Sequence, residues 1–137
     1  MKRVWVPLLL IVALAAIAVV GYWLKRPAEA HAVDCIDPLA GCTFRHRGTL
    51  LTAIFSTQPT PLGAFQLSVR APGVTRIHAE FQMNGMEMGF NRYDLRPTAN
   101  GMFVGKITLP VCVSGRHDWT MYLEVDGMRY ALPFSTL

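Results

Sequence analysis

The chain has 137 residues, of which 52% are hydrophobic and 16% charged, and a formal net charge of +4. This length holds one domain plus a targeting segment and excludes two full domains. The basic residues are scattered, without a run or a nucleic-acid motif, so we expect no nucleic-acid binding.

The N-terminal segment predicts a membrane anchor over residues 1–26. Residues 4–24 carry no charge, and at about 1.5 Å per residue they span roughly 30 Å, the thickness of a bilayer core. Trp5 lies near one end and Trp23 near the other, as in an aromatic belt. The positive-inside rule only weakly favours one orientation of the anchor in the membrane, because both flanks are basic. A cleaved signal peptide is the alternative, with Ala30-His31-Ala32 as its cleavage site.

The cysteines indicate the compartment. Residues 27–42 read as a linker that contains Cys35 and Cys42 in the turn-rich stretch DCIDPLAGC. We expect these two to form a disulfide, although two free thiols are the alternative, and a disulfide favours an oxidising space. The body is therefore predicted to lie outside the cytoplasm, attached to a single-pass anchor. Cys112 lies in an apolar run and reads as a buried hydrophobic residue.

Residues 43–137 predict an all-β domain. Seven short runs with alternating apolar and polar residues are separated by Gly, Pro, Asn and Asp, a pattern typical of an antiparallel β-sandwich or small barrel. The runs cover residues 49–57, 64–71, 74–83, 86–95, 101–110, 118–127 and 128–137. Asp126-Gly127 and Asn84-Gly85 are two-residue hairpin signals.

Three methionines surround the second hairpin signal: Met83, Met86 and Met88. A type I′ turn at Asn84-Gly85 would oppose Met83 and Met86, with their Cβ atoms roughly 5 Å apart. Thioether sulfur is a soft ligand that selects Cu(I) over hard cations, and it needs no deprotonation. The alternative is core packing, since methionine also fills irregular gaps in protein interiors. Both interpretations stay open from the residues alone.

Two histidines are candidate further ligands, His78 in the strand that ends at Met83 and His117 in the loop before Trp119. A lone histidine is more often a solvated surface residue. The chain has no HxH, HxxxH or CxxC spacing, so the strong zinc and copper templates are absent. It also lacks a Ser-His-Asp order, paired catalytic carboxylates and a Gly-rich phosphate loop, and we therefore expect no enzyme.

Three stretches carry a resemblance to a known family. They are the methionine segment, Gly101-Met102-Phe103, and Ser114-Gly115 leading to Trp119, and together they resemble the YtkA-like and FixH-like domains. The resemblance covers about residues 67–137 and the anchor. The longer spacing from Gly115 to Trp119 and the Cys35–Cys42 loop depart from the family pattern. The resemblance implies an immunoglobulin-like β-sandwich with a role in bacterial copper handling and in the assembly of haem-copper oxidases. With it, the expected location is the bacterial inner membrane, as a single-pass protein with its body in the periplasm.

We therefore expect a membrane-anchored module that binds Cu(I) through Met83, Met86 and Met88, with His78 or His117 as fourth ligand. Its partner would be a membrane complex or a copper protein. The alternative function is an interaction or assembly subunit of a membrane complex that holds no metal.

Overall fold

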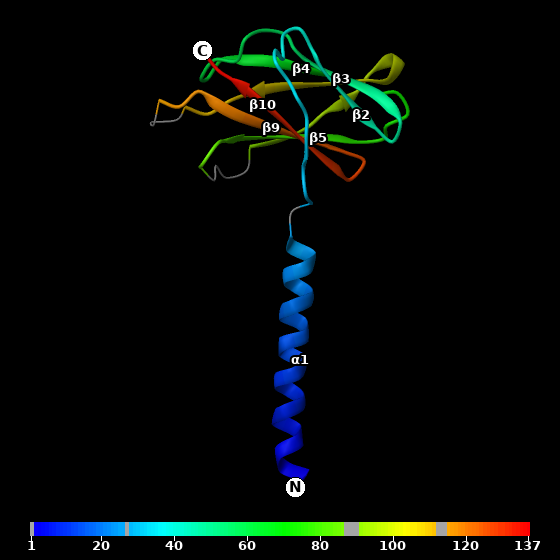
Figure 1. Ribbon diagram of the computed structural model, residues 1–137, viewed down its shortest axis with the longest axis vertical. Coiled ribbons are helices and arrows are strands. Elements are labelled where there is room, and N and C mark those ends of the chain that lie inside the picture. Colours follow the sequence, from blue (N-terminus) through cyan, green and yellow to red (C-terminus); the bar gives the residue numbers. More distant parts are fainter. Residues whose placement is uncertain (1, 27, 87–90, 112–114) are drawn as a thin grey trace.

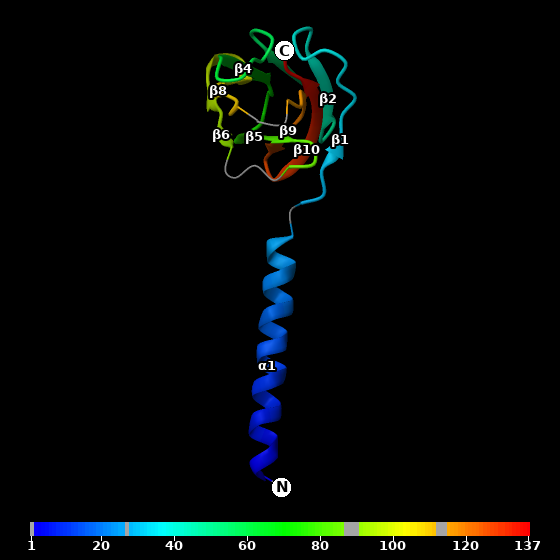
Figure 2. The same ribbon diagram turned by 90° about the vertical axis from the view of Figure 1, so that its left-hand side faces the viewer.

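The computed structural model describes residues 2–26, 28–86, 91–111 and 115–137. One long helix precedes a body made of two β-sheets, and the helix extends away from the body on the side of the sheet that contains β5, β9 and β10 (Figures 1 and 2). The predicted β-sandwich preceded by one apolar helix is confirmed.

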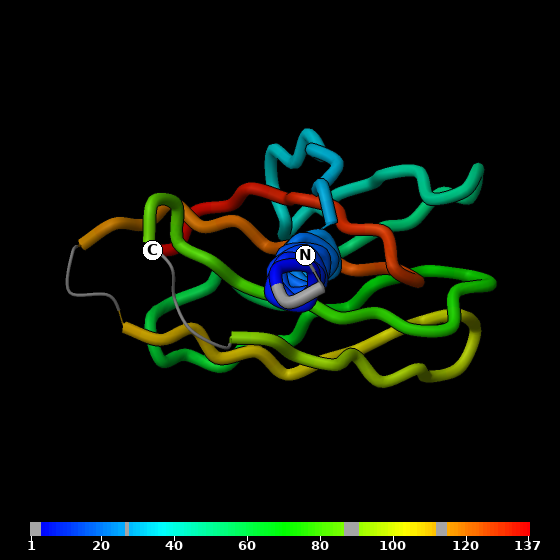
Figure 3. Tube along the Cα trace, turned by 90° about the horizontal axis from the view of Figure 1, so that it is seen from below, coloured from blue at the N-terminus to red at the C-terminus, as the bar shows by residue number. Residues whose placement is uncertain are grey.

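Helix α1 (Lys2–Lys25) contains a candidate membrane span, Val4–Lys25, with a mean hydropathy of 2.8 and none of its most apolar window buried against the body. Figure 3 looks along this helix and shows the sandwich extending to both sides of it. Arg26 follows the helix and lies over the rings of Tyr22 and Trp23, 5.0 and 5.3 Å from their centroids. A cation and two amphipathic rings at one end of an apolar helix are typical of a membrane interface.

The sandwich consists of two five-stranded sheets. Sheet 1 has the order β1-β10-β9-β5-β6 and sheet 2 the order β2-β3-β4-β8-β7. The pairs within each sheet are antiparallel except for β1 with β10, which is parallel. The strands are β1 (His31–Ala32), β2 (Cys42–His46), β3 (Thr49–Phe55), β4 (Ala64–Arg70), β5 (Ile77–Met83), β6 (Arg92–Asp94), β7 (Arg96–Pro97), β8 (Met102–Thr108), β9 (Asp118–Val125) and β10 (Met128–Ser135), with a short 3-10 helix at Ala99–Gly101.

The core lies between the two sheets and follows from the alternation in the sequence. Every second residue of β5 is buried, from Ile77 to Met83, and its intervening residues are half-buried. Aromatic rings fill the centre, where Phe81 meets Phe65 and Phe134 edge to face at centroid distances of 6.1 Å. Rings of this size bury a large apolar area and favour tilted contacts.

The strand boundaries differ from the sequence-based expectation in several places, and one of them is β2, which lies outside the seven expected runs. The linker expected over residues 27–42 contains β1, and Val33 after it is buried and donates its backbone N–H to Ala131. The single run expected over residues 86–95 contains a bridge at Met86 and strand β6, while residues 87–90 lie outside the described part of the chain. The hairpin expected at Asp126-Gly127 joins β9 to β10, and both residues have positive φ, as a type I′ turn requires.

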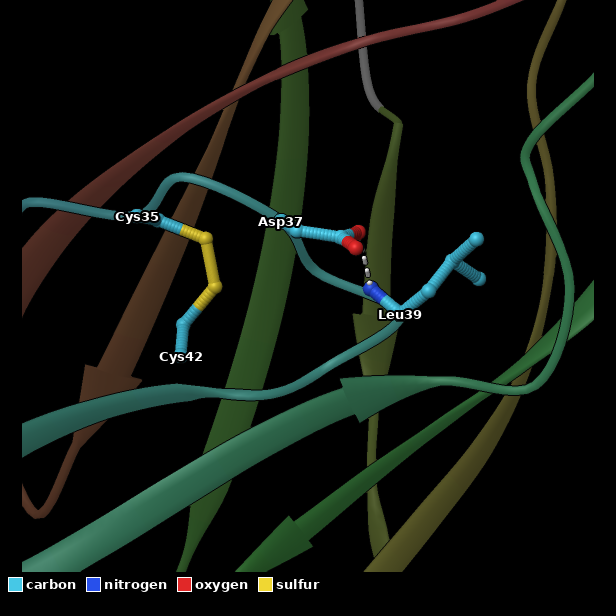
Figure 4. The surroundings of a disulfide bond; sticks show 4 residues. All are labelled: Cys35, Asp37, Leu39 and Cys42. Carbon is cyan, nitrogen blue, oxygen red and sulfur yellow. Dashed lines mark hydrogen bonds between the residues drawn. A yellow bond between two sulfur atoms is a disulfide. The ribbon is translucent and has the colours of Figure 1, made fainter.

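A disulfide joins Cys35 to Cys42, with their Cα atoms 5.2 Å apart (Figure 4). The loop between them is organised by Asp37, whose carboxylate accepts the backbone N–H of Leu39 at 2.9 Å. Cys42 is buried at the start of β2. The bond therefore fixes the chain just after β1 to the first strand of the other sheet.

Candidate functional site

The methionine turn connects the end of β5 to Met86. Met83 and Met86 form an isolated antiparallel bridge, and the backbone N–H of Met86 donates to the carbonyl of Met83 at 3.2 Å. The two residues are therefore opposed across the turn, as expected. The expected type I′ geometry is wrong, because only Gly85 has a positive φ (80°) and Asn84 does not.

The two methionines differ in exposure. Met83 is 2% exposed and belongs to the hydrophobic core, whereas Met86 is 42% exposed. Met83 is in register with Trp119 of β9, whose ring is also buried. Met83 thus has a packing role, and of these two methionines Met86 is the one that is exposed to solvent.

His117 lies at the same end of the sandwich. A small cavity of about 50 Å³ is lined by Met83, His117 and Trp119 together with Pro61, Leu109, Pro110, Gly115, Arg116 and Thr136. His117 is exposed and is oriented by Thr136, since its Nδ1 lies 3.3 Å from Thr136 Oγ1 and its carbonyl accepts the Thr136 backbone N–H at 2.9 Å. The imidazole and the Met83 side chain therefore border one space that exceeds the volume needed for a single water.

Polar contacts hold this end of β5 against β9. Asn84 donates its backbone N–H to the carbonyl of Asp118 at 3.2 Å and accepts the hydroxyl of Thr120 at 2.8 Å. Arg116 donates two hydrogen bonds to the carboxylate of Asp118, at 2.9 and 2.7 Å. The hydrogen bonds from Arg116 lower the pKa of Asp118, which therefore stays ionised at neutral pH. Arg116 Nη1 would lie 3.5 Å from a Cβ added at Gly85, so the guanidinium borders the methionine turn.

The structure does not bring His78 to the methionines. His78 is five residues before Met83 on β5, which separates them by about 16 Å along a strand and places them on opposite faces. Its Nδ1 contacts the carboxylate of Asp94 on β6 instead. On geometry His78 is not a fourth ligand, and His117 is the histidine that reaches the methionine end.

Met88 and Cys112 lie outside the described residues. Within the described ranges, no group of three or more His, Cys, Asp or Glu side chains could hold a metal ion. A metal site at this end would therefore depend on methionine sulfur and His117 rather than on a carboxylate or histidine cluster.

The sequence reasoning missed a second histidine environment. His46 is 4% exposed, and its Nδ1 lies 2.8 Å from the hydroxyl of Tyr130. Burial lowers the pKa of His46, and Arg47 adds to this effect by repelling the imidazolium. The available signal was the alternation of Cys42, Phe44 and His46, which places the histidine on the buried face of β2.

Comparison with protein-family models, with curated proteins and with solved structures finds no match. The resemblance to YtkA-like and FixH-like domains therefore stays an expectation from the sequence.

Proposed function

We propose that this protein is a membrane-anchored, extracytoplasmic β-sandwich that binds Cu(I) at the end of the sandwich that carries Met83, Met86 and His117. The observation that supports the proposal is geometric. Met83 and Met86 oppose each other across one turn, and Met83 shares a cavity wall with His117.

The donor set suits a soft, reduced metal. Two thioethers and one imidazole bind Cu(I) well, whereas Mg²⁺ prefers oxygen and structural Zn²⁺ prefers thiolate and histidine. The thioethers carry no proton that a metal must displace, so only His117 would make binding depend on pH. Met88, the third sulfur expected from the sequence, lies outside the described residues.

The proposed location rests on the anchor and on the start of the sandwich. Cleavage after Ala32 would remove β1, which pairs with β10, and would leave the edge of β10 open. An uncleaved helix keeps this strand.

The Cys35–Cys42 disulfide suits an oxidising compartment such as the periplasm. With the family resemblance, Cu(I) delivery during respiratory oxidase assembly is the role that we propose.

The test is a Cu(I) titration of the full-length protein in detergent against a competing chelator. Met86→Leu removes the exposed sulfur at nearly constant volume, and His117→Asn removes the imidazole. We expect each to weaken Cu(I) binding by at least about tenfold, the equivalent of roughly 1.4 kcal/mol. The melting temperature should change little, because both side chains are substantially exposed.

The matched control is Met102→Leu. Met102 is a half-buried methionine at the start of β8, seven residues and roughly 23 Å from Leu109, which lines the cavity. This variant should bind Cu(I) like the wild type. Equal losses in Met86→Leu and Met102→Leu, or no Cu(I) binding by the wild type, would overturn the proposal.

A failed titration would favour the alternative, a metal-free interaction subunit. One surface feature supports that function. Leu50 and Ile54 lie on the outer face of β3, on either side of Thr52, with 56% and 40% of their surfaces exposed. Apolar side chains exposed on a folded domain can contribute to a protein interface.

A further inference from the structure

A second pocket lies on the opposite side of the sandwich from β6 and β7, where the two edge strands β1 and β2 face each other. Its volume is about 460 Å³. Its walls come from β1, β2, β10 and the residues that follow β1 and β2, and they include His31, Val33, Phe44, Arg45, Arg47 and Tyr130. This pocket is separate from the methionine end and does not depend on copper binding.

The pocket combines an aromatic floor with a cationic rim. Phe44 and Tyr130 are both buried, and their ring centroids are 4.7 Å apart. The Tyr130 hydroxyl is held by His46, and His31 packs on the Tyr130 ring at 5.7 Å. These contacts fix the floor before any ligand arrives.

The rim is positively charged. Arg45 and Arg47 are exposed residues that line the pocket, and Asp34 is the one acidic residue in its lining within the part of the chain that the structure describes. Two guanidinium groups against one carboxylate leave a net positive rim. Guanidinium groups bind phosphate oxygens through paired hydrogen bonds, so the pocket suits a phosphate group attached to an apolar body.

The anchor keeps this pocket close to the membrane. Arg26 ends the basic flank of α1, and His31 begins β1 only five residues later. Five residues span at most about 18 Å even when fully extended. The headgroup layer itself is several ångströms thick on each side of the hydrocarbon core. The pocket is therefore tethered within reach of lipid headgroups, where anionic lipids attract basic side chains.

We propose that the pocket between β1 and β2 binds the phosphodiester headgroup of an anionic phospholipid. Arg45 and Arg47 hold the phosphate, and the glycerol end of the lipid lies against Phe44 and Tyr130. Binding would orient the sandwich on the membrane surface and restrict the motion that a short linker otherwise permits.

The opposite edge of the sandwich supplies a matched control. A pocket of about 490 Å³ there is lined by Arg96, Lys106 and the single acid Asp94. It has nearly the same volume and charge, but it lies at the β7 edge of sheet 2, four strand spacings or about 19 Å from β2. Among the described residues that line it, none is aromatic.

The experiment uses native mass spectrometry of the full-length protein in a neutral detergent, titrated with phosphatidylglycerol or with phosphatidylcholine. We expect preferential retention of phosphatidylglycerol. The R45Q/R47Q double variant should weaken it roughly twentyfold, since each arginine near a lipid surface contributes about fivefold. R96Q/K106Q should bind like the wild type, and R45K/R47K, which keeps the charge but loses the paired hydrogen bonds, should fall between the wild type and R45Q/R47Q.

Equal losses in R45Q/R47Q and R96Q/K106Q would overturn the proposal, because they would indicate unspecific attraction to surface charge. Equal retention of the two lipids by the wild type would also overturn it. The same titration with millimolar inorganic phosphate separates the two sources of this ligand chemistry. Displacement of phosphatidylglycerol by phosphate at equal concentration would assign the pocket to a soluble anion and contradict a lipid site.

Discussion

Met83 and Met86 are three residues apart and have different environments. Met83 is packed in the core beside Trp119, whereas almost half of the Met86 surface is exposed. A change at Met83 therefore alters packing and any metal site together. A substitution at Met86 removes a thioether with little effect on the core. Met86→Leu is therefore the variant that tests copper binding.

His46 is the residue whose protonation should affect stability near neutral pH. Burial and Arg47 lower its pKa, and the nearby Asp126 carboxylate opposes this shift. The unfolded chain takes up a proton as the pH falls through about 6.5, while the folded chain resists it. The folded state therefore loses stability as the pH falls from about 6.5 towards the lowered pKa of His46.

We predict that His46→Gln reduces this acid sensitivity between about pH 7.5 and 5. The measurement is the melting temperature of both proteins across that range. Asp126 does not confuse the result. Burial raises the pKa of Asp126, but the hydrogen bonds from the backbone N–H groups of Thr75 and Arg76 help to outweigh this effect and to hold the pKa below its ordinary value of 3.8. The contribution of Asp126 to stability is therefore lost only under more acidic conditions. An equally steep decline in His46→Gln would show that another group controls the acid response.

The methionine turn is the element on which the copper proposal depends. Its one unusual backbone conformation is at Gly85, with φ at 80°, and a Cβ there would meet nothing closer than Arg116 Nη1 at 3.5 Å. Space is therefore available, and the cost of a side chain at this position is backbone strain alone.

Gly85→Ala should lower the free energy of unfolding by about 1 kcal/mol, because an alanine is strained at this φ. Gly85→Asn should cost less, since asparagine tolerates the left-handed region better. Urea denaturation at equilibrium measures both. A wild-type stability for Gly85→Ala would mean that the turn adopts another geometry in solution.

Much of the sandwich could be predicted because the alternation of a strand is a local signal. The buried faces of β5, β9 and β10 follow directly from it. Strand β1 could not be predicted in this way. It has two residues and forms only by pairing with β10, about a hundred positions later in the chain. Strand β2 is short and begins at Cys42, the last residue of the turn-rich disulfide loop. Its alternation of buried and exposed residues was therefore not recognised as a strand.

The candidate site was only partly predictable for a similar reason. The opposition of Met83 and Met86 follows from a turn between neighbours. The approach of His117 to Met83 depends on the pairing of β5 with β9, which sequence spacing does not reveal. The placement of His78 could have been corrected in advance, because an odd separation of five residues puts it on the other face from Met83.

At the scale of the whole molecule, an exposed apolar helix is attached to a well-packed sandwich. In the part of the chain that the structure describes, none of the most apolar window of this helix is buried, and Val4–Lys25 is long and apolar enough to cross a membrane. The linker to the sandwich is short, and β1 and the Cys35–Cys42 disulfide fix its far end. If the helix spans a membrane, as we propose, the body therefore has a restricted range of positions above it.

We predict that the protein stays in the membrane fraction at full length after alkaline carbonate extraction. The physical reason is that the span is longer than a signal peptide requires, and that cleavage after Ala32 would remove β1. N-terminal sequencing of the extracted protein is the check. A mature N-terminus at Val33 would instead identify a cleaved signal peptide.

The most direct test of the central claim is X-ray absorption spectroscopy of the full-length protein loaded with one equivalent of Cu(I). Cys112→Ser should serve as the background, so that a thiolate does not replace the thioethers. We predict a mixed sulfur and nitrogen coordination shell that loses one sulfur in Met86→Leu and its imidazole in His117→Asn. A shell of nitrogen and oxygen alone, or one unchanged by both substitutions, would contradict a copper site at the methionine turn.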